Sequence, residues 1–193
     1  PLLITKNGVK STNIEEQLIA IPGENTTAHL LFTLRFPHAR NKIFLRYDAI
    51  EDFVLQGKGL GVIIHENRFT YKAKGLEKIT DLGEDWELLT KLPIPLGGIV
   101  MNRQFDKNLQ LKVDALIRQS IAYAYAKYPL LNDYIKLHSQ EMSEEVMQQH
   151  INLYVNNYSM NLGKEGKEAV VKLMDVFCEM HKISINYSDI FVD

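Results

Sequence analysis

Short apolar runs alternate with amphipathic stretches along the first hundred residues of the chain. The apolar runs are rich in Leu, Ile and Val, which is typical of buried strands. They predict strands at Leu2–Thr5, Gln17–Ile21, Lys42–Arg46, Leu60–Ile64, Lys78–Leu82 and Gly97–Asn102. The segments between them predict helices at Thr26–Phe36, Asp48–Gln56 and Glu84–Leu92. Strand, tight loop and helix in alternation indicate an α/β fold with a largely parallel sheet.

The pattern changes after Asn102, because the second half shows helical periodicity and no convincing strand. One long helix is predicted from Asn108, its candidate cap, to the vicinity of Pro129. Its apolar face consists of Leu109, Val113, Leu116, Ile117, Ser120 and Ala124. A second helix begins at Ser143 and carries Met147, Ile151, Tyr154, Val155 and Tyr158 on one stripe. A third spans Glu165 to about His181, and all three stripes are typical of core packing.

Composition narrows the classes of protein that fit this pattern. The chain has 22 basic and 24 acidic residues and a net charge of −2, so charge alone provides no general attraction to nucleic acid or to an anionic membrane. The single cysteine, Cys178, excludes an internal disulfide and fits a reducing compartment. The sequence shows neither a long apolar run nor a secretion signal. We therefore expect a cytoplasmic globular protein with no nucleic-acid or membrane partner.

The first candidate site lies where the strand Gln17–Ile21 runs into a turn with Pro22 and Gly23. Thr26, Thr27 and Ala28 follow at the start of the next helix. Free backbone amides and the positive end of the helix dipole favour a carboxylate or phosphate at such a position. Plain helix capping by Asn25 or Thr26 explains the same residues, and the two roles are compatible.

The second candidate is His65, which stands at the end of the apolar strand Leu60–Ile64. Ligands of open α/β sheets bind beyond the carboxyl ends of strands. An imidazole ordinarily titrates close to neutral pH, so it can accept a proton there, and Glu66 could fix its tautomer. The alternative is an ordinary hydrogen-bonded loop histidine.

Other chemistry-bearing residues are given structural interpretations. The remaining histidines, which lie in or beside helical stretches without metal-ligand spacing, are His29, His38, His138, His150 and His181. The glycine-rich segment Gly57–Gly61 precedes a strand, whereas a phosphate-binding loop follows one and opens a helix. We expect a turn there and no metal site.

Several ordered blocks of the chain resemble one known family. The main blocks are Gly61–Glu66 with Arg68–Tyr71, Asp81–Trp86 and Leu92–Gly97. Further blocks follow the order found in the family: Pro22-Gly23 and Thr26–Ala28 before them, and Tyr154–Asn156, Ser159 and Gly163 after them. Together they resemble the 1,4-dihydroxy-6-naphthoate synthases of the futalosine route to menaquinone, over essentially the whole chain.

The resemblance implies a fold similar to that of type 2 periplasmic binding proteins, with two α/β lobes around a cleft. One α/β lobe would comprise residues 5–96, and residues 1–4 and 97–193 would supply crossing strands and the helical remainder of the other lobe. It also implies a lyase that cleaves cyclic dehypoxanthine futalosine to 1,4-dihydroxy-6-naphthoate without a metal or organic cofactor. His65 matches the family's proposed general base, and Thr27 and Ala28 match positions that contact the carboxylated ligand.

The sequence departs from the family at its N-terminus, where Pro1 directly precedes a predicted strand. Family members carry a further α/β stretch there, so we expect an upstream part to be absent and activity of this chain alone to be uncertain. The apolar helix faces left uncovered would favour pairing with a second copy.

Three rival interpretations stay open at this level. A solute-binding protein of the same fold is one, because fold does not fix function. The sister enzyme that dehydrates chorismate is another, although the block His65-Glu66 with Phe69-Thr70-Tyr71 favours the synthase. A non-catalytic interaction module is the third.

Overall fold

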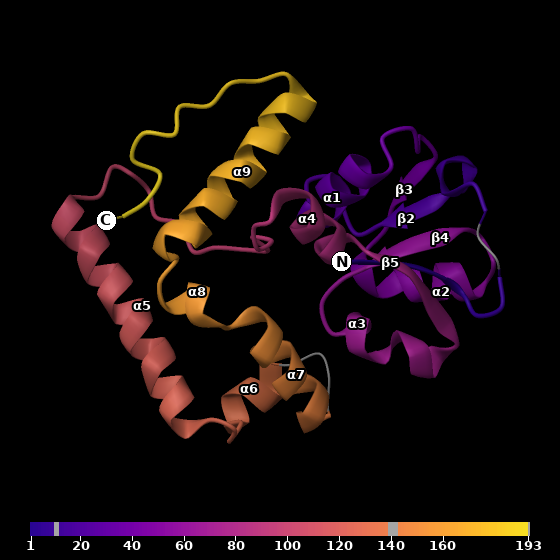
Figure 1. The fold of residues 1–193 in the computed structure, drawn as a ribbon. Coiled ribbons are helices and arrows are strands. Elements are labelled where there is room, and N and C mark those ends of the chain that lie inside the picture. Colours follow the sequence, from indigo (N-terminus) through magenta and orange to yellow (C-terminus); the bar gives the residue numbers. More distant parts are fainter. Residues whose placement is uncertain (10–11, 139–142, 193) are drawn as a thin grey trace. The chain divides into compact units, whose positions relative to one another are not determined.

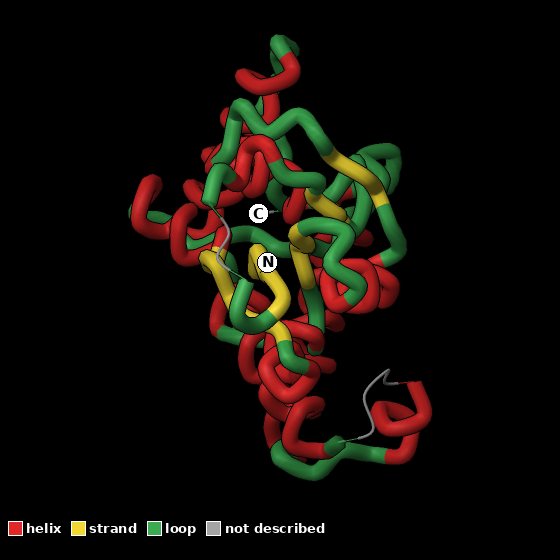
Figure 2. Tube along the Cα trace, turned by 90° about the vertical axis from the view of Figure 1, so that its right-hand side faces the viewer, coloured by secondary structure: helices red, strands yellow, loops and turns green. Residues whose placement is uncertain are grey.

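The chain divides into two compact units, Pro1–Lys91 and Leu92–Asp193. The computed structural model describes residues 1–9, 12–138 and 143–192. In these ranges every strand belongs to the first unit (Figure 1). The second unit consists of helices and connecting loops, which Figure 2 colours red and green.

The first unit is built on a mixed five-stranded sheet. Its strands are β1 (Leu2–Lys6), β2 (Ile19–Ile21), β3 (Lys42–Phe44), β4 (Leu60–Ile63) and β5 (Leu76–Asp81), in the spatial order β3-β2-β4-β1-β5. β2 runs parallel to β3 and β4, whereas β1 lies between β4 and β5 and runs antiparallel to both. The predicted parallel sheet is therefore correct for β3, β2 and β4 and wrong for β1. The apolar run Leu2–Thr5 is buried, and such a run carries no information about strand direction.

Helices cover both faces of this sheet. They are α1 (Thr27–Arg35), α2 (Ile50–Leu55), the single turn α3 (Asn67–Thr70) and α4 (Leu82–Thr90), with 3₁₀ turns at Ile14–Glu16, Tyr47–Ala49 and Tyr71–Lys74. α1 and α4 lie side by side, and α2 packs on the central strands (Figure 1). Thr26 caps α1 and Asp81 caps α4 through their side-chain oxygens, so both helices start where short polar side chains can accept backbone N–H groups.

Alternation along the central strands divides the core between the two faces. Leu2 and Ile4 of β1 join the cluster beneath α2, together with Ile50 and Val54 of that helix. Leu3, between them, points to the opposite face, because successive side chains of a strand alternate. Leu3 and Trp86 of α4 are both essentially inaccessible to solvent. The central strands β1, β2 and β4 are thus buried on both faces, which explains why they are continuous apolar runs, whereas the edge strands β3 and β5 are partly exposed.

Gly61 of β4 is the point at which α2 approaches the sheet most closely. A Cβ atom at this position would lie 2.5 Å from Cγ2 of Ile50 and 2.7 Å from Cγ2 of Val54. Both methyl groups belong to buried β-branched side chains that cannot swing away. We therefore expect Gly61→Ala to lower the free energy of unfolding by about 1–3 kcal/mol, the usual cost of overpacking. Urea unfolding followed by fluorescence of Trp86, the chain's single tryptophan, measures this loss in the first unit.

The matched control is Gly97→Ala, because a Cβ atom there meets no atom within 4 Å. Its free energy of unfolding should stay within about 0.5 kcal/mol of that of the parent protein, as for other surface substitutions. An equally stable Gly61→Ala variant would show that α2 is free to move away from β4.

The second unit contains five helices among its described residues. They are α5 (Lys107–Lys127), α6 (Asp133–His138), α7 (Glu144–Tyr154), α8 (Asn157–Met160) and α9 (Gly163–His181). The long predicted helix is confirmed as α5, but its cap is Asp106, whose carboxylate accepts the N–H of Leu109, and not Asn108. The stripe predicted from Met147 to Tyr158 is divided between α7 and α8, since Asn156 begins a new helix with a capping box.

The strand predicted at Gly97–Asn102 is wrong, because this segment has no regular structure. Ile99 and Val100 are 78% and 91% exposed, and no described segment pairs with them. An extended segment becomes a strand only when a neighbour accepts and donates its backbone hydrogen bonds. The predicted apolar face of α5 is only partly covered, since this helix has no buried residue and Val113 and Ile117 are half-buried.

The two compact units meet in sequence at Lys91 and Leu92, next to the segment with two prolines and two glycines. The lobes inferred from the resemblance, residues 5–96 against 1–4 and 97–193, stay a prediction. Among the residues that the structure describes, no helix combines the length and apolar character needed to cross a bilayer.

Candidate active site

Three parallel strands deliver the candidate residues to one edge of the sheet. β2 pairs with β4 in the register Ile19↔Leu60 and Ala20↔Gly61, and with β3 in the register Ile21↔Phe44. The chain therefore leaves β2, β3 and β4 at the same level and on the same side. Parallel strands place the loops after their carboxyl ends together, which is where α/β proteins bind small molecules.

The middle of the three strands, β2, leads into the start of α1. The hydroxyl of Thr26 donates to the carbonyl oxygen of Gly23 at 2.8 Å and accepts the N–H of His29 at 3.2 Å. Its hydrogen-bonding capacity is thus used in capping, as the capping interpretation predicted. Of the two candidate caps, Thr26 is confirmed, and Asn25 precedes the cap.

Capping by Thr26 satisfies the N–H of His29 and leaves the backbone N–H groups of Thr27 and Ala28 without an acceptor in the cap. The described residues place no acceptor on either group, in accordance with the unsatisfied first turn of an α-helix. Ala28 is buried and Thr27 is partly exposed, so the helix start is firmly packed and, of the two, only Thr27 reaches the surface. Two such amides with the helix dipole behind them form a cradle for one carboxylate, which we call the α1 cradle.

His29, treated from the sequence as structural, holds the loop that precedes this cradle. Its Nδ1 atom lies 2.7 Å from the carbonyl oxygen of Glu24, which can only accept, so Nδ1 carries the proton. Nε2 can then accept from the ammonium group of Lys42 at 3.3 Å. That ammonium also donates to the hydroxyl of Thr33 at 2.7 Å, and partial burial lowers the pKa of Lys42. Strand β3, helix α1 and the loop between β2 and α1 are thereby joined.

His65 occupies the end of β4, two residues beyond Ile63. Its side chain is exposed, and its backbone has φ 56°, in the left-handed region that few residues other than glycine adopt. Its imidazole packs edge to face against the ring of Tyr47, with centroids 5.3 Å apart and an interplanar angle of 75°. Tyr47 follows β3, so this contact joins the loops of the two strands that flank β2.

A buried ion pair fixes the segment that follows His65. Nη2 of Arg68, in α3, donates to Oδ2 of Asp81 at 2.9 Å, and Asp81 is only 4% exposed. The other carboxylate oxygen of Asp81 accepts the N–H groups of Gly83 and Glu84 at the start of α4. One carboxylate therefore ties the turn carrying His65 to β5 and α4, and truncation of Arg68 would leave the buried charge of Asp81 without its cationic partner.

The structure thus brings His65 and the start of α1 to neighbouring strand ends, and it adds Tyr47 to them. Sequence reasoning singled out His65, Thr26, Thr27 and Ala28 but not Tyr47, although Tyr47 also lies just beyond a predicted strand. In residues 1–9, 12–138 and 143–192, no three His, Cys, Asp or Glu side chains gather as metal ligands would. The arrangement offers an imidazole to move a proton and amide groups to hold an anion.

A mixed α/β unit with these groups beyond its parallel strands has the layout of an α/β protein that handles a small molecule. The family described as menaquinone biosynthesis matches residues 1–179 of the chain. The chain belongs to this family.

Two curated relatives agree with that assignment. A protein of Thermus thermophilus named 1,4-dihydroxy-6-naphthoate synthase is 40% identical over 174 residues, and one of the same name from Streptomyces coelicolor is 36% identical over 180 residues. Each alignment covers 90% of this chain and 63% of the relative, so the chain spans less than two thirds of their length. A crystal structure of an Archaeoglobus fulgidus protein superposes with a TM-score of 0.84 at 28% identity, covering 94% of this chain and 67% of that one.

Proposed function

We propose that the chain carries the proton-transfer and anion-binding elements of a 1,4-dihydroxy-6-naphthoate synthase. The reaction is the cleavage of cyclic dehypoxanthine futalosine to 1,4-dihydroxy-6-naphthoate with release of a sugar-derived fragment, which makes the protein a carbon–carbon lyase. The observation that supports this proposal is that β2, which leads to the α1 cradle, and β4, which leads to His65, are adjacent parallel strands. The names of both curated relatives support it.

The proposed chemistry assigns a separate task to each group. The amides of Thr27 and Ala28 hold the substrate carboxylate, while the hydroxyl of Thr26 keeps the first turn of α1 in place. The imidazole of His65 removes a proton from the sugar-derived part of the substrate. Carbon–carbon cleavage follows, and aromatisation of the new ring drives it. Positioning and exclusion of water supply the rest of the acceleration.

The proposal extends to the whole protein. Its fold is proposed to be two-lobed, like that of type 2 periplasmic binding proteins, with the first unit contributing one wall of the cleft. A cytoplasmic location is part of the same proposal and fits the single cysteine, Cys178. Pairing with a second copy through the partly exposed apolar face of α5 stays a prediction.

The test incubates the protein at its natural length with cyclic dehypoxanthine futalosine and follows naphthoate by its absorbance and mass. We expect turnover without added metal or cofactor. Binding of the substrate without naphthoate release would contradict the lyase assignment and support the solute-binding alternative. Dehydration of chorismate by the same preparation would instead assign the sister activity. Parallel assays of the 193-residue chain show whether it suffices for activity.

A further inference from the structure

Tyr47 follows the edge strand β3 and stands against the imidazole of His65. Their rings meet edge to face at 5.3 Å, a geometry that stabilises an aromatic pair beyond the area it buries. Tyr47 is only partly exposed although it lies in a surface turn. This contact spans the end of β2, because β2 lies between β3 and β4 in the sheet.

The turn that carries Tyr47 is itself held in place on both sides of this residue. Nε of Arg46 donates to Oδ1 of Asp48 at 2.7 Å, and Nη2 of the same guanidinium contacts Oδ2. This hydrogen bonding holds the pKa of the Asp48 carboxyl below its usual range. Leu45 donates its N–H to the carbonyl oxygen of Ile21 at 3.0 Å, so the strand pairing continues almost to Tyr47. The backbone that carries Tyr47 is therefore anchored to β2.

His65, by contrast, projects from a left-handed turn with an exposed side chain. The backbone fixes where its Cβ atom lies, but the orientation of the imidazole depends on what packs against the ring. The ring of Tyr47 packs edge to face against the imidazole, and its position is set by a different strand. Such a contact restricts the rotamers that the imidazole can adopt, of which only some face the substrate.

We propose that Tyr47 is a positioning residue for His65, whose aromatic ring holds the imidazole in the orientation from which it takes the substrate proton. This proposal rests on the function proposed above. The role belongs to the ring of Tyr47 and not to its hydroxyl group, since the two residues meet through their rings. Tyr47 sets the rate of the proton-transfer step and leaves anion binding to the α1 cradle.

Three substitutions separate the ring from the hydroxyl group and from bulk. Tyr47→Phe keeps the ring, so its kcat should stay within about twofold of the parent protein. Tyr47→Ala and Tyr47→Leu remove the aromatic contact, and both should lower kcat by roughly 5- to 10-fold with little change in KM, as expected when a catalytic group is misoriented. Tyr47→Leu keeps much of the side-chain volume and serves if the Ala variant does not fold.

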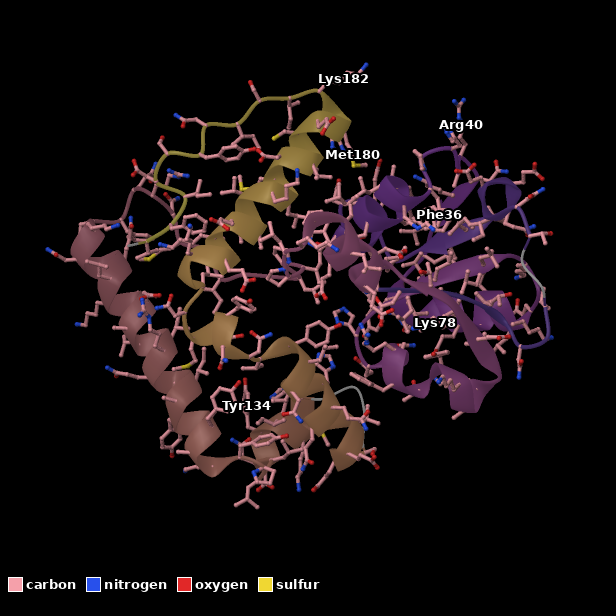
Figure 3. The ribbon with its side chains drawn as sticks, in the orientation of Figure 1. Phe36, Arg40, Lys78, Tyr134, Met180 and Lys182 are labelled. Carbon is pink, nitrogen blue, oxygen red and sulfur yellow. The ribbon has the colours of Figure 1, made fainter. Side chains whose placement is uncertain are left out.

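The matched control is a second Tyr–His ring pair, Tyr134 with His138 on α6, whose centroids are 4.5 Å apart. Tyr134 is 72% exposed and belongs to no element of the candidate site (Figure 3). Tyr134→Ala should therefore leave kcat unchanged. It shows whether loss of any exposed Tyr–His contact slows the enzyme.

A spectroscopic measurement tests the contact without relying on turnover. The ring protons of His65, assigned by comparison with His65→Gln, should shift in Tyr47→Ala and stay near their original positions in Tyr47→Phe. If the His65 signals shift but the parent protein forms no naphthoate, the contact between Tyr47 and His65 is supported and the proposed function is refuted. An unchanged kcat in folded Tyr47→Ala, or a Phe variant as slow as the Ala variant, would overturn the positioning role.

Discussion

Replacement of His65 by alanine should lower the rate of naphthoate formation by roughly 10²- to 10⁴-fold, the scale on which a general base contributes. Substrate affinity should change little, because the imidazole acts on the sugar-derived part while the α1 cradle holds the carboxylate. Single-turnover kinetics together with equilibrium titration of the substrate measure the two quantities separately.

The backbone at His65 complicates a simple alanine substitution. With φ 56°, a residue carrying a Cβ atom is strained, and Asn tolerates this region better than Ala. His65→Asn therefore removes the base while sparing the turn, and it should be as slow as His65→Ala. His38→Ala is the control, since His38 is exposed and follows the opposite end of α1. A near-normal rate in His65→Asn would remove this imidazole from the mechanism.

His65 and Thr26 were accessible to sequence reasoning because their positions follow from local rules. Each lies just beyond an apolar run, and strand ends are where α/β proteins place ligand-binding residues. Thr26 could also be recognised as a cap, since a short polar side chain before a helical pattern accepts N–H groups of the first turn. The connection from β2 to α1 and the connection from β4 to His65 can thus each be predicted from a short stretch of sequence.

Other features depend on residues far away in the sequence. The helical turn α3 is anchored by the pairing of Arg68 with Asp81, thirteen positions further on. The contact of Tyr47 with His65 joins two loops, and no spacing in the sequence records it. The apolar pattern of the segment Gly97–Asn102 predicts a strand, but no strand among the described residues pairs with it, so the pattern alone gave the wrong structure. The direction of β1 was set by where it inserts in the sheet, which a buried apolar run does not specify.

A negative charge at the start of α1 should separate helix stability from ligand binding. Thr27 is the first residue of this helix, where an acidic side chain interacts favourably with the dipole by about 0.3–1 kcal/mol. Thr27→Asp should therefore leave the protein as stable as its parent or slightly more so. The same carboxylate lies beside the amides that are proposed to hold the substrate carboxylate. Two like charges about 4 Å apart repel by about 1 kcal/mol in water and about 4 kcal/mol at an effective dielectric constant of ~20.

Affinity for the naphthoate product should accordingly fall roughly 10- to 100-fold in Thr27→Asp, while the midpoint of thermal unfolding stays the same or rises. Thr27→Asn is the matched control, because the Asn side chain has nearly the shape of Asp but carries no charge. This variant should bind the naphthoate product within a few-fold of the parent protein. Calorimetric titration at two salt concentrations adds a second criterion, since repulsion between exposed charges weakens as salt screens it. Equal affinities of the Asp and Asn variants would place the carboxylate elsewhere. A destabilised Asp variant would instead show that the amides of Thr27 and Ala28 do not form the open end of α1.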